Sequence, residues 1–182
     1  MPDLAALPRP RTLVHPGPYD PVRIRHMHAP CARHFRLALA PGRTLFDAIV
    51  DPLLALGLKS ASMTVLGGGF ERLHFCVAQP DPSGRAVAAY TPPRDAGAAF
   101  MIFGNATLGK TERGAPIVHC HAAFRGADGR VHGGHVLGER SVLGPQPIPV
   151  LVTAFEGFEL RVKMDHETNM PLLRPQMETD DA

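Results

Sequence analysis

One stretch of this chain has the spacing of an amphipathic helix, and short alternating segments separated by turn residues fill most of the rest. The apolar residues of that stretch recur at intervals of four and three, at Leu45, Ile49, Leu53 and Leu56. Thr44 can cap the start of the helix, Asp47 favours its positive end, and Gly57 ends it. Pro52 cannot donate a backbone hydrogen bond, so it predicts a kink, or a restart with Asp51 as the cap.

Strand candidates, recognised by alternating apolar and polar side chains, account for most of the remaining sequence. They lie at residues 35–40, 61–66, 70–78, 86–91, 99–107, 117–124, 131–137 and 150–163. Gly67-Gly68-Gly69 is interpreted as a bend between two of them rather than a phosphate loop, because no Lys-Ser/Thr pair and no helix follow it. Many short strands and one helix predict an α+β domain, a mostly antiparallel twisted β-sheet with the helix packed on it.

Composition divides the 182 residues into three segments. Residues 1–34 form a proline- and arginine-rich arm, in which five arginines against two aspartates give a charge of +3. Residues 35–165 form the folded domain, and residues 166–182 form a flexible acidic tail, in which one arginine against four acidic residues gives −3. The whole chain has a net charge of +2, which neither predicts nor excludes an anionic partner.

The cysteines and the apolar runs indicate the compartment. Cys31, Cys76 and Cys120 form no CxxC pair and no even-numbered disulfide framework, which is typical of a reducing compartment. No apolar stretch reaches the ~18–20 residues that span a bilayer, and prolines interrupt the N-terminal residues where a leader needs a continuous apolar run. The sequence therefore predicts a soluble, cytoplasmic protein without a membrane partner.

Two histidines occupy alternate positions of the strand candidate 117–124. Because side chains of a strand alternate between its two faces, His119 and His121 share a face. Cys120 lies between them in the sequence and points to the opposite face, which makes it a poor third ligand for anything that the two histidines bind.

The turn that follows decides which residue lies opposite His121. A three-residue loop at 127–129, with Gly129 in the left-handed conformation, is a common hairpin type. It places His135 directly opposite His121 and puts His132 on the other face. A two-residue loop would shift the register by one residue, unless a bulge in the second strand restores it.

Three imidazoles that converge on one point suit a divalent metal ion. Zinc is the first candidate, because three histidines, here His119, His121 and His135, leave its fourth tetrahedral position open. Nickel, copper or iron could bind the same set, since the ligand type alone does not decide the metal. The alternative is that His119 and His121 are ordinary residues on the surface of the sheet and that His135 caps a glycine-rich bend.

The same hairpin carries a signature of the form Gly-x-Pro-x-x-His-x-His, then Asp-Gly, then Gly-Gly-His. Its residues are Gly114-Ala115-Pro116-Ile117-Val118-His119-Cys120-His121, Asp128-Gly129 and Gly133-Gly134-His135. This pattern resembles that of the PPC domain (plants and prokaryotes conserved domain), a family often described as DNA-binding. The resemblance covers about residues 35–165. It implies a compact α+β domain that assembles as a homotrimer, and it implies that the three signature histidines hold a metal ion in prokaryotic members.

Plant members of that family also carry an AT-hook, which grips the minor groove of DNA through an Arg-Gly-Arg-Pro core. The nearest approach here is Pro-Arg-Pro-Arg at residues 8–11, which lacks the glycine. Plant members have a glutamate in the strand before Gly104, whereas residues 97–101 of this chain contain no acid. The resemblance therefore implies a stand-alone bacterial member without an AT-hook, and the partner recognition of the plant proteins is not carried over to this chain.

These observations predict a metal-binding module with a binding or regulatory role, in which a small molecule could bind at the open metal position. The alternative is a small metal-dependent enzyme, in which that position activates water and Glu71, Glu112 or Glu139 serves as the base. A third class is DNA binding, in which the arginines of the arm contact phosphates without reading the base sequence.

Overall fold

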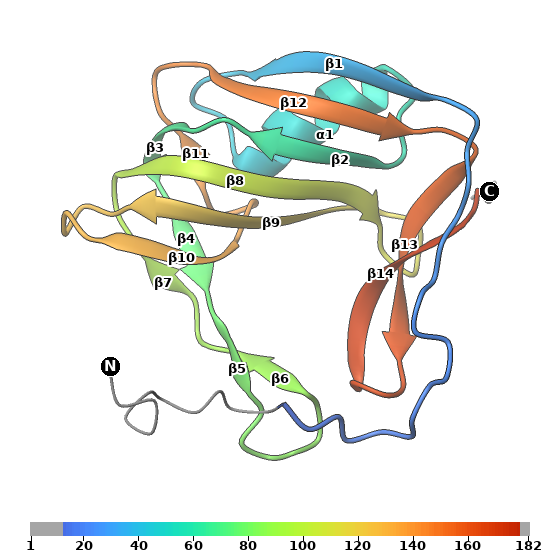
Figure 1. Ribbon diagram of the computed structural model, residues 1–182. Helices are drawn as coiled ribbons and strands as arrows, with labels where there is room; N and C mark the ends of the chain where they lie inside the picture. Colours follow the sequence, from blue (N-terminus) through green and yellow to red (C-terminus); the bar gives the residue numbers. More distant parts are fainter. Residues whose placement is uncertain (1–12, 179–182) are drawn as a thin grey trace, which may run out of the picture.

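The computed structural model describes residues 13–178 and shows one large, twisted and mostly antiparallel sheet with a helix packed on it (Figure 1). The helix is α1 (Leu45–Ala55). The strands, in chain order, are β1 (Ala32–Leu39), β2 (Ala61–Val65), β3 (Gly68–Arg72), β4 (His74–Cys76), β5 (Ala78–Pro80), β6 (Ala88–Tyr90), β7 (Arg94–Asp95), β8 (Ala99–Lys110), β9 (Pro116–Arg125), β10 (Val131–Val136), β11 (Val142–Leu143), β12 (Ile148–Phe155), β13 (Phe158–Asp165) and β14 (Met170–Met177). The predicted fold class, an α+β domain dominated by antiparallel strands, is confirmed.

The strand order brings β9 and β10 into the body of the sheet. The main path runs β1-β12-β2-β8-β9-β10-β4-β7, while β3 and β13 join it at β8. The pair between β13 and β8 is parallel, through Arg161 and Lys110, and the other strand pairs of the described residues are antiparallel. Strands β5 and β6 form a separate hairpin below the sheet in Figure 1.

Helix α1 covers one face of the sheet, behind β1, β12 and β2 in Figure 1. Its fully buried stripe consists of Leu45, Ile49 and Leu53. The Thr44 hydroxyl accepts a hydrogen bond from the Asp47 backbone N–H (3.0 Å), which confirms the predicted cap. The helix runs through Pro52 without the predicted restart. Leu56 is 52% exposed because the helix ends there, so the prediction that it belongs to the buried stripe is wrong.

Two strand predictions merged elements that the structure separates. Residues 70–78 form parts of β3, β4 and β5, because the chain leaves its pairing with β8 at β3 and pairs with β10 at β4. Residues 150–163 belong to β12 and β13, separated by a turn at Gly157, whose φ is +79°. The bend predicted at the glycine triplet is confirmed, since Gly67 has a φ of +104° and strand β3 follows it.

The predicted flexible tail is wrong for most of its length. Residues 170–177 form β14, which pairs with β13 over eight residue pairs. Pro171 and Pro175 hid this strand from sequence reasoning, because proline cannot donate to a ladder. Among the described residues β14 pairs with β13 alone, so it is an edge strand. The two prolines lie an even number of residues apart, so the backbone N–H groups that they lack would point to the same side of the strand, and an edge tolerates this. Residues 179–182 lie outside the described part of the chain.

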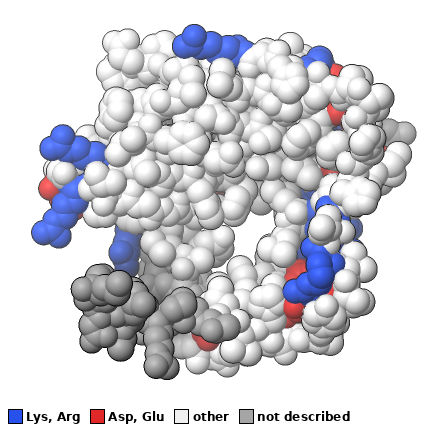
Figure 2. Space-filling view, viewed as in Figure 1, with Lys and Arg blue, Asp and Glu red and all other residues white. Residues whose placement is uncertain are grey.

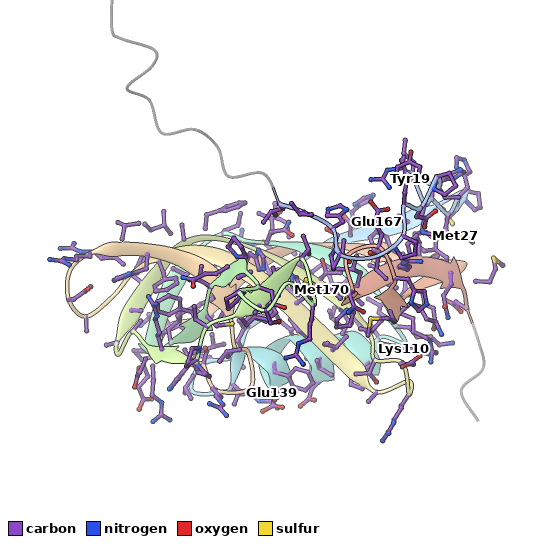
Figure 3. The ribbon with its side chains drawn as sticks, turned by 90° about the horizontal axis from the view of Figure 1, so that it is seen from below. Tyr19, Met27, Lys110, Glu139, Glu167 and Met170 are labelled. Atoms are coloured by element: carbon purple, nitrogen blue, oxygen red, sulfur yellow. The ribbon has the colours of Figure 1, made fainter. Side chains whose placement is uncertain are left out.

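Residues 13–31 of the predicted arm form no helix or strand, as expected, and β1 begins three residues before the predicted boundary. Glu167, in the turn between β13 and β14, holds the arm in place. Its carboxylate accepts hydrogen bonds from the Arg23 guanidinium (2.5 Å) and the Asp20 backbone N–H (2.9 Å), and the His15 ring lies 2.7 Å away. Figure 3 shows Tyr19 of the arm on the same side of the molecule as Glu167. The Pro-Arg-Pro-Arg stretch at 8–11 lies outside the described residues.

The same turn also fixes the loop between β5 and β6. The Val87 backbone N–H donates to the Thr168 carbonyl (2.8 Å), and the Asn169 side chain donates to the Arg85 carbonyl (2.6 Å). These bonds join the two hairpins below the sheet, and Figure 2 shows the opening that remains between them and the sheet. The β5–β6 hairpin is therefore held at both ends.

Within residues 13–178, no helix is long and apolar enough to cross a membrane. All three cysteines are free of disulfides: Cys76 and Cys120 are buried, as predicted for thiols that pack as small apolar residues, while Cys31 is exposed. The cytoplasmic location stays a prediction from the sequence.

Candidate metal centre

Strands β9 and β10 form the hairpin that the histidine spacing predicted, in the predicted register. The Gly126 backbone N–H donates to the Arg130 carbonyl (3.0 Å) around a three-residue loop, and Gly129 has a φ of +75°. His121 consequently lies directly opposite His135. The short loop and its left-handed glycine thus set which residues meet across the hairpin.

Strand parity sorts the neighbouring residues as expected. Cys120 is completely buried in the core, on the face away from His119 and His121. His132 pairs with Phe124 and stacks on its ring at 5.8 Å between centroids, again on the core side of the hairpin. Both therefore lie on the face opposite the histidine cluster, which confirms the predicted placement of their side chains.

The histidines lie on the open face of the sheet, which α1 does not cover. Residues paired directly across seven neighbouring strands form a row on that face. The row consists of Arg36, Leu151, Thr64, Asn105, His121, His135 and Cys76. Since cross-strand partners project to the same side, His121 and His135 stand next to each other, and His119 lies one step along β9.

The three rings are close enough to share one ion. Ring centroids are 4.6 Å apart for His119 and His135, 4.7 Å for His119 and His121, and 5.5 Å for His121 and His135. One nitrogen of each ring lies within 4.8 Å of the others. Metal–nitrogen bonds of ~2.0–2.1 Å bring such nitrogens within ~4 Å of each other, so small side-chain rotations would suffice.

Burial keeps two of the three histidines in the protonation state that binds metals. It lowers the pKa of His135 to about 4, helped by the nearby rings of His119 and His121. Burial likewise lowers the pKa of His119, and His121 adds to that effect. Neutral imidazoles offer a lone pair to a metal, whereas protonated ones do not, so both rings are ready ligands at neutral pH.

One nitrogen of the cluster is without a hydrogen-bond partner. Nδ1 of His135 is buried and accepts or donates no hydrogen bond within residues 13–178. Buried polar atoms are nearly always satisfied by protein, water or an ion, so this nitrogen fits a metal ligand or its supporting contact better than an ordinary surface histidine.

Two residues that the sequence did not single out border His135. The Tyr90 ring of β6 lies 5.3 Å from the His135 ring, and Cys76 of β4 is its cross-strand partner. Neither could be found from local spacing, because β4 and β6 come from distant parts of the chain. Only the pairing of β4 with β10, which the sequence did not reveal, places Cys76 there.

A pocket of about 330 Å³ adjoins His135 at the end of β10. Of the three glutamates considered as bases, Glu139 lines this pocket, whereas Glu71 lies exposed on β3 and Glu112 lies in the turn after β8. Figure 3 shows Glu139 on the α1 side of the molecule. The pocket thus extends from the rim of the histidine cluster towards the helix.

The geometry defines a β-domain with one helix and a candidate metal centre on the open face of its sheet. The chain belongs to the Plants and Prokaryotes Conserved (PCC) domain family, whose profile matches residues 27–155. This is the family that the histidine signature resembles. No curated protein matches the sequence.

Solved structures of similar fold come from bacteria and archaea. A "putative DNA-binding protein" from Ralstonia eutropha is 20% identical, with a TM-score of 0.59 over 85% of this chain and 98% of that one. A metal-containing protein from Archaeoglobus fulgidus is 18% identical, with a TM-score of 0.62 over 83% and 98%. A plant- and prokaryote-conserved (PPC) protein from Pyrococcus horikoshii is 16% identical, with a TM-score of 0.58 over 84% and 100%. At these identities the likeness concerns the fold.

Proposed function

We propose that this PCC-domain protein is a metal-binding module with a binding or regulatory role, and that His119, His121 and His135 hold a divalent ion. The observation that carries the proposal is the convergence of three ring nitrogens within 4.8 Å on the open face of the sheet. The unpartnered Nδ1 of His135 supports it. The metal-containing relative from Archaeoglobus fulgidus adds support from the same fold.

Zinc is the first candidate for the ion. Three neutral nitrogen ligands suit its tetrahedral preference and leave one position for water or a ligand, while nickel, copper and iron accept similar donors. When bound, such an ion would polarise whatever occupies the fourth position. The part of the protein is to hold the three rings on a rigid hairpin and keep two of them uncharged.

Elemental analysis of the purified, dialysed protein tests the proposal. We expect about one equivalent of metal per chain in the wild type and in the His132→Ala variant, whose ring lies on the core side. We expect none in the His121→Ala/His135→Ala double variant. A wild type without stoichiometric metal, or a double variant that retains it, would overturn the proposal.

We also propose that the protein assembles as the homotrimer that the family resemblance implies. The open face supports self-association, because Phe103 and Leu151 on it are 52% and 48% exposed. Few charged side chains lie over β8, β9 and β12 on this face (Figure 2). Light scattering should give about 59 kDa for three chains of 19.6 kDa. A monomeric mass for the wild type would refute the trimer, and Phe103→Arg should reduce the mass.

A metal-dependent enzyme is the second candidate, favoured by the pocket that contains both His135 and Glu139. In that case Glu139 would act as a general base towards a molecule in the pocket. Hydrolysis of 4-nitrophenyl acetate by the zinc-loaded protein is a simple first assay. The rate should fall in Glu139→Gln and stay unchanged in Glu112→Gln, and equal rates in all three proteins would exclude this role for Glu139.

DNA contact through the arm is a weaker proposal. The three arm arginines in the described residues already pair with carboxylates: Arg23 with Glu167, Arg25 with Asp20 and Arg33 with Glu156. A gel-shift assay across salt concentrations tests it. Binding that falls steeply with salt and is lost after deletion of residues 1–30 would support the arm, and unchanged binding after the deletion would exclude it.

A further inference from the structure

The pocket beside His135 lies where β10 ends and the first residues of β9, from Pro116 onwards, have no partner in β10. Strand β10 pairs with β9 only as far as Val136 opposite Cys120. Leu137, the next residue, still pairs with β4, because its backbone N–H donates to the His74 carbonyl (2.9 Å), whereas no pair with β9 follows Val136. The space between the start of β9 and the segment after β10 is the pocket of about 330 Å³. Its size is at the lower end of the range for small-molecule sites.

Apolar side chains form much of the wall of this pocket. They come from the start of β9, the end of β10 and the residue after it: Ile117, Val118, Val136 and Leu137. Phe46 of α1 lines the far side. A molecule in this pocket would therefore meet an imidazole ring at one end and a hydrophobic surface along its length.

The charges around the pocket favour an anionic head group on that molecule. Glu139 and Arg140 line the pocket and carry opposite charges, so together they prefer neither sign. A divalent ion held by the three imidazoles would keep its two positive charges, because these ligands would donate lone pairs and no negative charge. A carboxylate is a good ligand for such an ion and neutralises part of that charge.

We propose that the pocket binds a small aliphatic carboxylate, whose carboxylate group ligates the metal beside His135 and whose hydrocarbon chain packs against Ile117, Leu137 and Phe46. This inference rests on the proposed metal site and adds the class of ligand. The sequence alone could not reveal the pocket, because Phe46 and Pro93 reach it from parts of the chain outside the histidine hairpin.

Cobalt-loaded protein offers a direct test, because the visible spectrum of cobalt(II) changes when its fourth ligand changes. Acetate, butyrate and hexanoate are titrated in turn, with hexylamine as a cationic control of equal chain length. We expect affinity to rise about fourfold for each methylene that the pocket removes from water, and no spectral change with hexylamine. Ile117→Ala should reduce the dependence on chain length and leave acetate affinity unchanged.

Two further variants keep the test decisive. Phe46→Leu lies outside the histidine hairpin and should also weaken hexanoate more than acetate, whereas Leu54→Ala, on the same helix but outside the pocket walls, should change neither. If cobalt binds stoichiometrically but the three carboxylates bind equally, the carboxylate inference is wrong and the metal site stands. If cobalt does not bind at all, the proposed function itself is wrong.

Discussion

The two neighbouring glycines before His135 should respond to alanine in opposite directions. A Cβ atom added to Gly134 would lie 2.6 Å from the backbone carbonyl oxygen of Cys76 and 3.1 Å from the ring of Phe75. A Cβ atom added to Gly133 would meet nothing nearer than the Ala122 carbonyl at 3.6 Å, an ordinary contact. The close approach of β4 to β10 is therefore possible only with glycine at position 134.

The loss of stability in Gly134→Ala can be estimated from the contacts that the added Cβ atom would break. The obstacle at Gly134 is backbone of β4, so the substitution has to push β4 away from β10, and those strands share only two residue pairs, His135 with Cys76 and Val136 with Phe75. Losing about two backbone hydrogen bonds at ~0.5–1.5 kcal/mol each costs ~1–3 kcal/mol of the free energy of unfolding. This matches the ~1–3 kcal/mol typical of overpacking. Gly133→Ala should be neutral or stabilise by up to ~1 kcal/mol, because glycine loses more entropy on folding.

Urea unfolding of the metal-free proteins, followed by far-UV circular dichroism, measures both effects. Gly134→Ala should also weaken cobalt binding by ~10-fold or more, since a shift of β10 displaces His135 from its partners, in the way that loss of supporting contacts does at metal sites. Equal midpoints for wild type and Gly134→Ala would refute the argument. So would a Gly133→Ala variant that is destabilised as much as Gly134→Ala.

Three further predictions follow from the fold and the site. Phe124→Ala should lower the free energy of unfolding by ~3–5 kcal/mol because its ring is fully buried, whereas Leu54→Ala, on α1 and 47% exposed, should change it by ~0.5 kcal/mol or less in the same urea assay. Hydrogen bonds from Arg23, His15 and the Asp20 backbone lower the pKa of Glu167 to about 2. The stability that these bonds give to the attachment of the arm is therefore complete above the usual pKa of 4.5 and is lost as pH falls towards 2. Trypsin should cut the arm of Glu167→Gln at neutral pH faster than that of the wild type, and equal cleavage rates would contradict the attachment through Glu167. Zinc at 100 times its dissociation constant should stabilise the protein by ~2.7 kcal/mol, which raises Tm by roughly 5–11 °C. A thermal-shift assay should show the same increase in the wild type and in His132→Ala. An unchanged Tm in the wild type would count against the metal site.

The cluster could be predicted from the sequence because its geometry is local. Parity along one strand and the length of one turn decide that His119, His121 and His135 share a face, and both depend on residues within the same hairpin. The helix could be predicted for the same reason, since its cap and its buried stripe follow from the spacing of residues 44–57. The exposed Leu56 shows that such a prediction loses accuracy at the end of an element, where the periodicity no longer applies.

The features that the sequence did not predict depend on contacts between segments far apart in the chain. Strand β14 was missed because two prolines suggested a loose tail, whereas the β13 edge tolerates them. The attachment of the arm to Glu167 was not predicted, because its hydrogen bonds join residues more than 140 positions apart, such as Arg23 and Glu167. The charges of opposite sign at the two ends of the chain were visible in the sequence, but nothing local specified which carboxylate would receive the arm.

The strand that closes the site shows why the glycines and the histidine of the signature belong together. Gly134 lets β4 approach β10, and the Leu137 backbone N–H continues that pairing by donating to the His74 carbonyl, so β4 holds the segment of β10 that borders the pocket. A larger residue at position 134 would therefore affect the position of His135 and the shape of its pocket at once. In the Gly-Gly-His sequence, Gly134 allows the close contact with β4 and His135 supplies an imidazole next to the pocket. The position of that imidazole therefore depends on Gly134.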